Sequence, residues 1–146
     1  MLRKITSSKT RIALLGVVVV LIIIYGFISF LIAQGVVNVD RKAQEDDPSK
    51  YNLTYEDVEF SSRDGLFKLS GWYLPGEEGS PHLVFVHGNG SVRSGDNAVE
   101  IASRLKPLGF GMLLFDMRGR GSSEGDIASG GYFERQDVLG AYDYLL

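Results

Sequence analysis

The feature that most constrains this chain is an uninterrupted apolar segment near its N-terminus. The 22 residues from Ile12 to Ala33 carry no charged side chain. As a helix rising about 1.5 Å per residue, this segment is about 33 Å long, which matches a hydrocarbon core of about 30 Å. Backbone groups in lipid must be hydrogen-bonded within the segment, so we expect a helix that spans the lipid bilayer despite its many β-branched residues.

A buried core helix and a cleaved signal peptide are two other interpretations of this segment. A helix without a polar face is difficult to bury in a chain of 146 residues. The apolar region of a cleaved signal peptide is about 7–15 residues long, which is shorter than this one. Ala33-Gln34-Gly35 is a weak small-x-small cleavage site, so cleavage stays open as an alternative. We predict an uncleaved signal anchor over residues 12–33.

The segments on either side of the anchor indicate its orientation. Residues 1–11 form a basic tail with four Lys or Arg residues and no acid, whereas residues 34–50 form a polar linker with three basic and four acidic residues. Because cytoplasmic flanks carry the excess of positive charge, we expect the N-terminus in the cytoplasm. The domain over residues 51–146 would then lie outside the cytoplasm.

Charge and cysteine content exclude several functions for this domain. Residues 34–146 carry 11 basic and 18 acidic side chains, a net charge of −7, which disfavours a nucleic-acid-binding surface. The chain has no cysteine, which excludes a disulfide scaffold, a thiolate nucleophile and a zinc–thiolate site. His82 and His87 point to opposite faces of one predicted strand, so no metal site is expected, and no cofactor is implied.

Strand-like periodicity dominates the first part of the domain. Apolar and polar residues alternate over residues 57–60 and 67–74, on either side of an Asp64-Gly65 turn signal, which predicts an antiparallel hairpin. Continuous apolar runs over residues 82–87 and 110–115 predict strands buried on both faces, as in a parallel sheet.

Helical spacing predicts two helices, over residues 96–106 and 134–146. The order hairpin, strand, helix, strand, helix predicts an α/β fold with right-handed crossovers. The side chains expected to face inward from the two helices are Ala98, Ile101, Ala102 and Leu105, then Val138, Ala141, Tyr142 and Leu145.

Two glycine-containing loops follow the two predicted buried strands. The first begins His87-Gly88-Asn89-Gly90, and the second is Asp116-Met117-Arg118-Gly119-Arg120-Gly121-Ser122-Ser123-Glu124-Gly125. Open α/β sheets bind ligands at the carboxyl ends of their strands. Glycines there leave backbone N–H groups free to point at a bound oxygen, as an oxyanion hole requires. A tight strand-to-helix turn explains the first loop equally well.

In this order, the hairpin and the two loops resemble the α/β-hydrolase superfamily from about Tyr55 to Leu146. The resemblance is greatest to membrane-anchored or secreted serine hydrolases with a His-Gly-Asn loop, and it implies part of an α/β-hydrolase-type sheet. It also implies that the backbone N–H of Asn89 donates to the oxyanion hole, the second donor being the residue after the nucleophile. His87 would hold its loop by hydrogen bonds. Residues implied to shape the two loops without doing chemistry are Gly88, Gly90, Asp116, Arg118, Gly119 and Gly121.

The stretch Gly121-Ser122-Ser123-Glu124-Gly125 matches the nucleophile-elbow pattern G-x-S-x-G. An elbow requires a strand that ends immediately before it and a helix that begins immediately after it. Residues 116–122 separate Ser123 from the preceding strand, and further glycines delay the next helix. We therefore predict that Ser123 is not the nucleophile.

The resemblance places the nucleophile after the next strand, and the acid and histidine of the triad later still. The chain stops within the helix that would precede that strand. We therefore expect the N-terminal part of a membrane-anchored serine hydrolase acting on esters, thioesters or peptides, inactive by itself. With half a sheet and an exposed strand edge, it is also expected to aggregate.

A dinucleotide-binding domain and a non-catalytic interaction protein are the two alternative functions. A dinucleotide-binding loop needs G-x-G-x-x-G at the start of a helix, but here the third glycine is one position late and Glu124 and Asp126 would repel phosphate. A non-catalytic membrane-anchored interaction protein is the other alternative, which the intact His-Gly-Asn-Gly loop disfavours.

Overall fold

The computed structural model describes residues 8–39 and 41–146, and the chain divides into two units, Met1–Val36 and Val37–Leu146. Residues 1–7 of the predicted basic tail lie outside the described residues. The first unit is built on helix α1 (Ser8–Val37), which contains the whole predicted spanning segment. Its stretch Ser8–Gly35 is long and apolar enough to cross a membrane, with a mean hydropathy of 3.0 and no burial against protein.

The second unit begins its sheet with the predicted hairpin. Strands β1 (Glu56–Ser61) and β2 (Lys68–Leu74) pair antiparallel, with Phe60 opposite Leu69. Both side chains are buried, and as directly opposite residues of paired strands they point to the same face of the sheet. The connecting turn includes Gly65, whose φ of +69° is the left-handed conformation that glycine adopts without strain.

Strands β3 (His82–Phe85) and β4 (Gly111–Phe115) complete a sheet of order β1-β2-β4-β3. β4 pairs antiparallel with β2 and parallel with β3, and all five of its residues are buried, as predicted. The prediction for β3 is wrong in two respects: the strand ends at Phe85, and its side chains are exposed or half-buried. Among the described residues β3 pairs only with β4, so its other edge is open.

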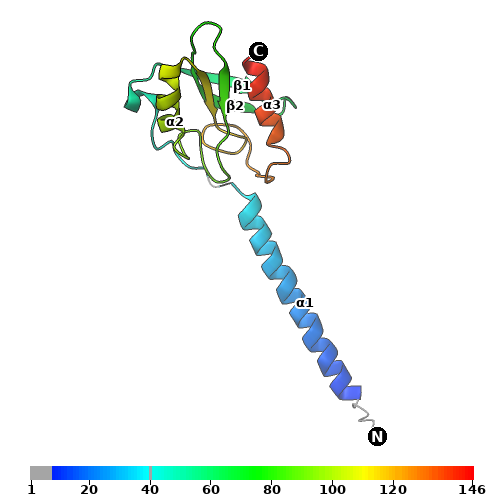
Figure 1. Cartoon of the computed structure of the whole chain (residues 1–146). Coiled ribbons are helices and arrows are strands. Elements are labelled where there is room, and N and C mark those ends of the chain that lie inside the picture. Colours follow the sequence, from blue (N-terminus) through cyan, green and yellow to red (C-terminus); the bar gives the residue numbers. More distant parts are fainter. Residues whose placement is uncertain (1–7, 40) are drawn as a thin grey trace, which may run out of the picture. The chain divides into compact units, whose positions relative to one another are not determined.

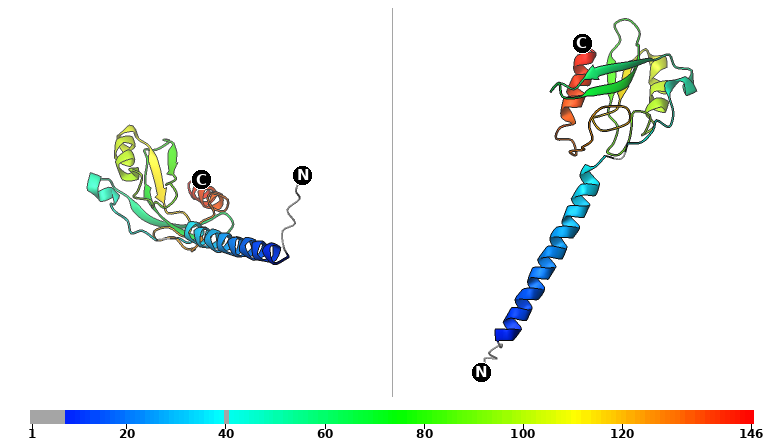
Figure 2. Two further views of the ribbon diagram at one scale, coloured as in Figure 1. Left: turned by 90° about the horizontal axis from the view of Figure 1, so that it is seen from below. Right: turned by 180° about the vertical axis from the view of Figure 1, so that it is seen from behind.

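Helices α2 (Ala98–Leu105) and α3 (Arg135–Tyr144) lie on opposite faces of the sheet, as both views of Figures 1 and 2 show. Two short 3-10 helices, η1 (Pro48–Tyr51) and η2 (Lys106–Leu108), lie beside α2 and directly after it. The core on the α2 face contains Trp72, Leu74, Met112 and Leu114, and the core on the α3 face contains Phe60, Leu69, Leu113 and Phe115.

Each helix is turned slightly from its predicted face. In α2 the buried residues are Ala98, Val99 and Ala102, and Ile101 is 37% exposed. In α3, Tyr142 is 53% exposed, whereas Gly140 is buried. A Cβ atom on Gly140 would lie 2.3 Å from the carbonyl oxygen of Ser61, so the backbone of α3 packs directly on the end of β1.

Candidate functional site

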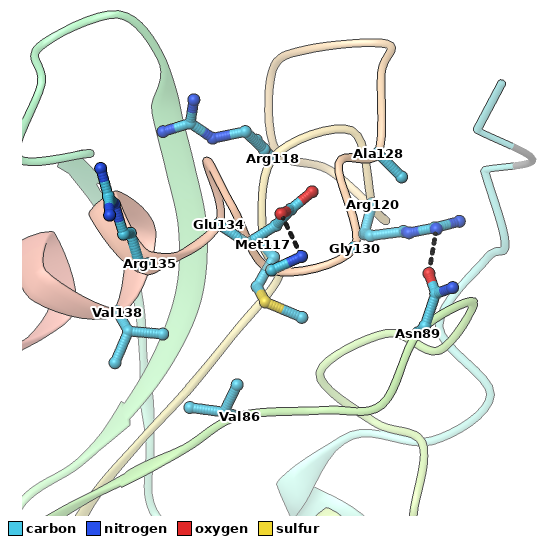
Figure 3. Close-up of a pocket in the computed structure, with 11 residues that line it drawn as sticks. Val86, Asn89, Met117, Arg118, Arg120, Ala128, Gly130, Glu134, Arg135 and Val138 are labelled. Atoms are coloured by element: carbon cyan, nitrogen blue, oxygen red, sulfur yellow. Dashed lines mark hydrogen bonds between the residues drawn. The ribbon is translucent and has the colours of Figure 1, made fainter. Parts of the chain in front are cut away.

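The two glycine-containing loops meet at the carboxyl ends of β3 and β4, beside a pocket of about 480 Å³ (Figure 3). Because these strands are parallel neighbours, the loops that follow them leave the sheet at the same edge. The residues that line this pocket include Val86, Asn89, Met117, Arg120, Glu134 and Val138.

His87 connects the two loops. Its side chain is 3% exposed, and its Nε2 accepts a hydrogen bond from the N–H of Met117 at 3.1 Å. Because Nε2 accepts, the proton of the neutral ring lies on Nδ1, which is 2.9 Å from the carbonyl oxygen of Gly88. Both ring nitrogens are therefore engaged with backbone, and the ring holds the end of β3 against the start of the β4 loop.

Asn89 lies where the β3 loop turns over the pocket. Its side-chain oxygen accepts a hydrogen bond from the Arg120 guanidinium at 2.8 Å, drawn as a dashed line in Figure 3. The next residue, Gly90, has a φ of +79°. Among the described residues, no group accepts a hydrogen bond from the backbone N–H of Asn89. This N–H is therefore available to a ligand oxygen.

The same loop is closed by a residue that sequence reasoning missed. The carboxylate of Asp96 accepts a hydrogen bond from the N–H of Gly88 at 2.6 Å. Asp96 and Asn97 both have left-handed backbones, with φ of 54° and 59°, which explains why α2 begins later than predicted. Two successive non-glycine residues in this conformation cost stability, and such strain is concentrated at functional sites.

Asp116, at the end of β4, is a completely buried carboxylate shared by three segments. It accepts hydrogen bonds from the N–H of Arg93 at 2.7 Å, the N–H of Ser122 at 3.1 Å and the side chain of Gln44 at 2.9 Å. Arg93 also approaches it with its guanidinium, 3.8 Å away, and stacks on the Trp72 ring. The carboxylate thus holds the β3 loop, the β4 loop and the preceding linker together.

Arg118 anchors the β4 loop to α3. Its guanidinium donates to Asp137 at 2.7 and 2.9 Å and to Asp64 at 2.9 Å, and its own N–H donates to Asp137 at 2.8 Å. Burial raises the pKa of Asp137, and the Arg118 guanidinium opposes this rise. The pair of Asp137 and Arg118 positions the β4 loop. The sequence did not indicate this pairing, because Asp137 lies within an otherwise helical pattern.

The other glycines of the β4 loop serve its close turns. Gly119 and Gly121 have φ of +73° and +45°, and a Cβ atom on Gly121 would lie 2.2 Å from Asp116 Oδ2. Ser123, in the G-x-S-x-G stretch, is 1% exposed. Its hydroxyl donates to the carbonyl oxygen of Asp116 at 2.5 Å and accepts from the N–H of Ser70 at 2.9 Å. That hydroxyl is therefore committed to backbone groups.

Glu134 forms the far wall of the pocket and was also missed. Its carboxylate accepts the N–H groups of Ser129 at 2.7 Å and Gly131 at 2.8 Å, together with the Ser129 hydroxyl. Burial by itself would raise the pKa of Glu134, but these hydrogen bonds outweigh it, so the pKa lies below its usual value. The ionised side chain closes the last turn of the loop before α3.

The predicted linker contributes a further set of contacts. The strap, defined here as residues 41–45, lies along both loops. Arg41 donates to the carbonyl oxygens of Gly121 at 3.2 Å and Ser123 at 2.6 Å, and also to that of Gly125. Gln44 accepts from the N–H of Ser94 at 3.2 Å, in addition to its bonds with Asp116. The composition of the linker gave no sign of these contacts.

The two histidines make separate contacts. Within residues 8–39 and 41–146, no group of three His, Asp or Glu residues is placed to hold a metal ion. His82 stacks on Tyr73 and its Nε2 lies 2.8 Å from that phenol oxygen. What the arrangement offers is an available backbone donor, an adjacent guanidinium and a partly apolar pocket.

Part of the chain is similar to known hydrolases. No family model matches the chain. Lysophosphatidylserine lipase ABHD12 of Danio rerio is 33% identical over 84 residues, which is 57% of this chain and 22% of that protein. An uncharacterized protein of Mycobacterium tuberculosis is 39% identical over 71 residues, 47% of this chain and 24% of that protein.

Among solved structures, the esterase Pf2001 of Pyrococcus furiosus has a TM-score of 0.66 at 29% identity, covering 75% of this chain and 42% of that one. A putative α/β hydrolase of Agrobacterium tumefaciens has a TM-score of 0.55 at 26% identity, covering 62% of this chain and 42% of that one. The second unit therefore has part of an α/β-hydrolase fold, and the resemblance to that superfamily is confirmed. The hydrolases that it matches include lipases and esterases, and the chain spans about 22% of the length of the first curated relative.

Proposed function

We propose that this chain is the part of a membrane-anchored serine hydrolase that carries the oxyanion-hole loop, and that the whole enzyme cleaves esters. The observation that carries the proposal is the backbone N–H of Asn89. Asn89 follows β3 and lines a pocket of about 480 Å³, and its backbone N–H has no acceptor among the described residues. The lipase and esterase names of the matched proteins support ester chemistry.

The surroundings of this N–H suit it to stabilise a developing oxyanion. A donor contributes most when it is fixed before the reaction, because no reorganisation is then needed as the charge develops. The bond from Arg120 to the Asn89 side chain, with the left-handed turn at Gly90, fixes the peptide. The Arg120 guanidinium also adds positive charge to this wall. Val86, Met117 and Val138 offer apolar contacts to an acyl group.

The serine nucleophile and its histidine base belong, in this proposal, to residues outside this chain. Ser123 is buried and bonded to backbone groups, and both histidines are engaged elsewhere. Residues 1–146 alone are then expected not to hydrolyse p-nitrophenyl acetate. Hydrolysis by this chain that a serine reagent abolishes would contradict this assignment.

We also propose that α1 stays attached as a signal anchor, with the N-terminus in the cytoplasm and the hydrolase domain on the other side. The length and hydropathy of Ser8–Gly35 and the basic residues before it support this orientation. In sealed vesicles whose cytoplasmic face is outside, protease added to the outside should leave the hydrolase domain intact. Digestion of the domain in these vesicles would show that it lies on the cytoplasmic side and would contradict the proposed orientation.

A fluorophosphonate probe tests the proposed enzyme class. The protein encoded by the complete reading frame that contains this chain should be labelled on one serine. Peptide mapping should place that serine outside residues 1–146. Ser123→Ala should leave the labelling intact. Absence of labelling in a folded protein would contradict a serine hydrolase, and loss of labelling in Ser123→Ala without loss of thermal stability would place the elbow at Ser123.

A further inference from the structure

Four large apolar side chains form an exposed patch beside the pocket. The loop patch, defined as Leu66, Ile127, Tyr132 and Phe133, has exposed fractions of 68%, 56%, 62% and 52%. Its members are contiguous. Leu66, Ile127 and Phe133 line one shallow hollow of about 220 Å³, and the rings of Tyr132 and Phe133 are 4.9 Å apart.

These residues belong to loops at one edge of the sheet. Leu66 lies in the turn between β1 and β2, and the other three lie between β4 and α3. Single exposed apolar residues are common on protein surfaces, but a contiguous group of this size, with two aromatic rings, is typical of a surface that contacts protein or lipid. Two charged residues, Asp126 and Arg118, also line the hollow.

The chain ties this patch to the end of the candidate membrane span. Asn38 forms an antiparallel bridge with Ile127, and the N–H of Ala128 donates to the carbonyl oxygen of Val37 at 3.0 Å. The span ends at Gly35, three residues before Asn38. Three residues of extended chain reach at most about 11 Å. The patch is therefore held close to the place where the chain leaves the span.

We propose that the loop patch inserts into the interface of the same bilayer that α1 spans. This inference rests on the anchor of the proposed function and adds a second point of contact with the membrane. An apolar surface inserts about 5–10 Å into the boundary between headgroups and acyl chains. Tyr132 suits that depth because a phenol has an apolar body and a polar tip, and Arg135, stacked on it at 5.0 Å, is placed to meet lipid phosphates. The pocket, whose wall includes Ala128, then opens close to the lipid surface.

The absence of cysteine from the chain allows a direct test. Single-cysteine variants at Phe133 and Ile127 are labelled with the fluorophore NBD in the full chain, reconstituted into phosphatidylcholine vesicles with and without lipid carrying a doxyl quencher. Leu108→Cys is the matched control, because Leu108 is 69% exposed and precedes β4, at the opposite edge of the sheet. Ile23→Cys reports on the insertion of α1.

The expected result is a loss of NBD emission with doxyl lipid at Phe133, Ile127 and Ile23, and none at Leu108. Quenching at Ile23 alone would overturn the inference and leave the anchor standing. No quenching at any position would contradict the anchor as well. Blue-shifted emission at Phe133 without quenching would assign the patch to a protein contact, and quenching at Leu108 as well would indicate an unfolded domain on the membrane. Each of these outcomes also overturns the inference.

Discussion

At the scale of single residues, Glu134 makes the stability of the loop before α3 depend on pH. Its lowered pKa means that its carboxylate stabilises the fold above the unfolded pKa of about 4.3. This contribution is lost as the pH falls through the lower folded pKa. The contribution of ionised Glu134 and its three donors to the free energy of unfolding is therefore largest near neutral pH and is absent in strong acid.

Glu134→Gln should lower the free energy of unfolding by about 1–3 kcal/mol at pH 7, because a buried set of charge-assisted hydrogen bonds is lost. The difference from the unmodified protein should shrink as the pH falls below about 4. Urea unfolding, followed by the fluorescence of the single tryptophan, Trp72, measures both. Glu78→Gln, at an exposed turn, is the control and should have little effect. An equal loss at pH 3 and pH 7 would contradict the assignment.

Two features of the structure, its backbone conformation and its contact with Asp116, require a glycine at position 121. Its φ is +45°, and a Cβ atom would lie 2.2 Å from the buried carboxylate of Asp116. Gly121→Ala should therefore destabilise the domain by more than the strain alone, which is about 1–3 kcal/mol. Gly79→Ala is the matched control, with φ of +78° and nothing within 4 Å of the added atom. Equal losses for the two variants in urea unfolding would show that the contact with Asp116 is unimportant.

At the scale of elements, the strap is expected to hold the β4 loop. Arg41 is hydrogen-bonded to the carbonyl oxygens of Gly121, Ser123 and Gly125. Arg41→Ala should raise amide hydrogen exchange over residues 121–128 by about fivefold, since losing about 1 kcal/mol of local stability has that effect. Lys42→Ala, at the neighbouring exposed position, should leave the exchange unchanged. Unchanged exchange in Arg41→Ala would mean that the strap does not restrain the loop.

The elements themselves could largely be predicted from periodicity. The hairpin, the buried strand β4 and both helices lie where alternation and helical spacing placed them, because these patterns depend on local geometry. The orientation of each helix could not be predicted, since it depends on contacts such as Gly140 on the end of β1. The half-buried state of β3 depends on whether another strand covers its free edge, which the sequence of β3 cannot specify.

The loops show the same division between local and tertiary information. The loops with the His-Gly-Asn-Gly and Asp-Met-Arg-Gly motifs follow β3 and β4, the strands after which the sequence pattern placed them. The partners that hold these loops, among them Asp96, Asp137 and Arg41, are polar residues in segments with no distinctive pattern. Such long-range pairings become visible only when the sheet brings the segments together.

At the scale of the whole molecule, the chain contains two units that differ in which side chains they expose. The Ser8–Gly35 stretch of α1 is apolar and not buried against protein, whereas the second unit buries a core on both faces of its sheet. The strap connects the residues that follow α1 to the β3 and β4 loops.

The central claim, that the Asn89 N–H stabilises an oxyanion, is tested most directly by two substitutions at that position in the complete reading frame. Asn89→Pro removes the N–H, and Gly88 before it tolerates a following proline well. Asn89→Ala keeps the N–H and loses only the side-chain bond to Arg120. On p-nitrophenyl esters, we predict that Asn89→Pro lowers kcat by about 10²–10³ with little change in KM, while Asn89→Ala loses about tenfold or less. Equal activity of the two variants, with both folded by thermal unfolding, would contradict the account.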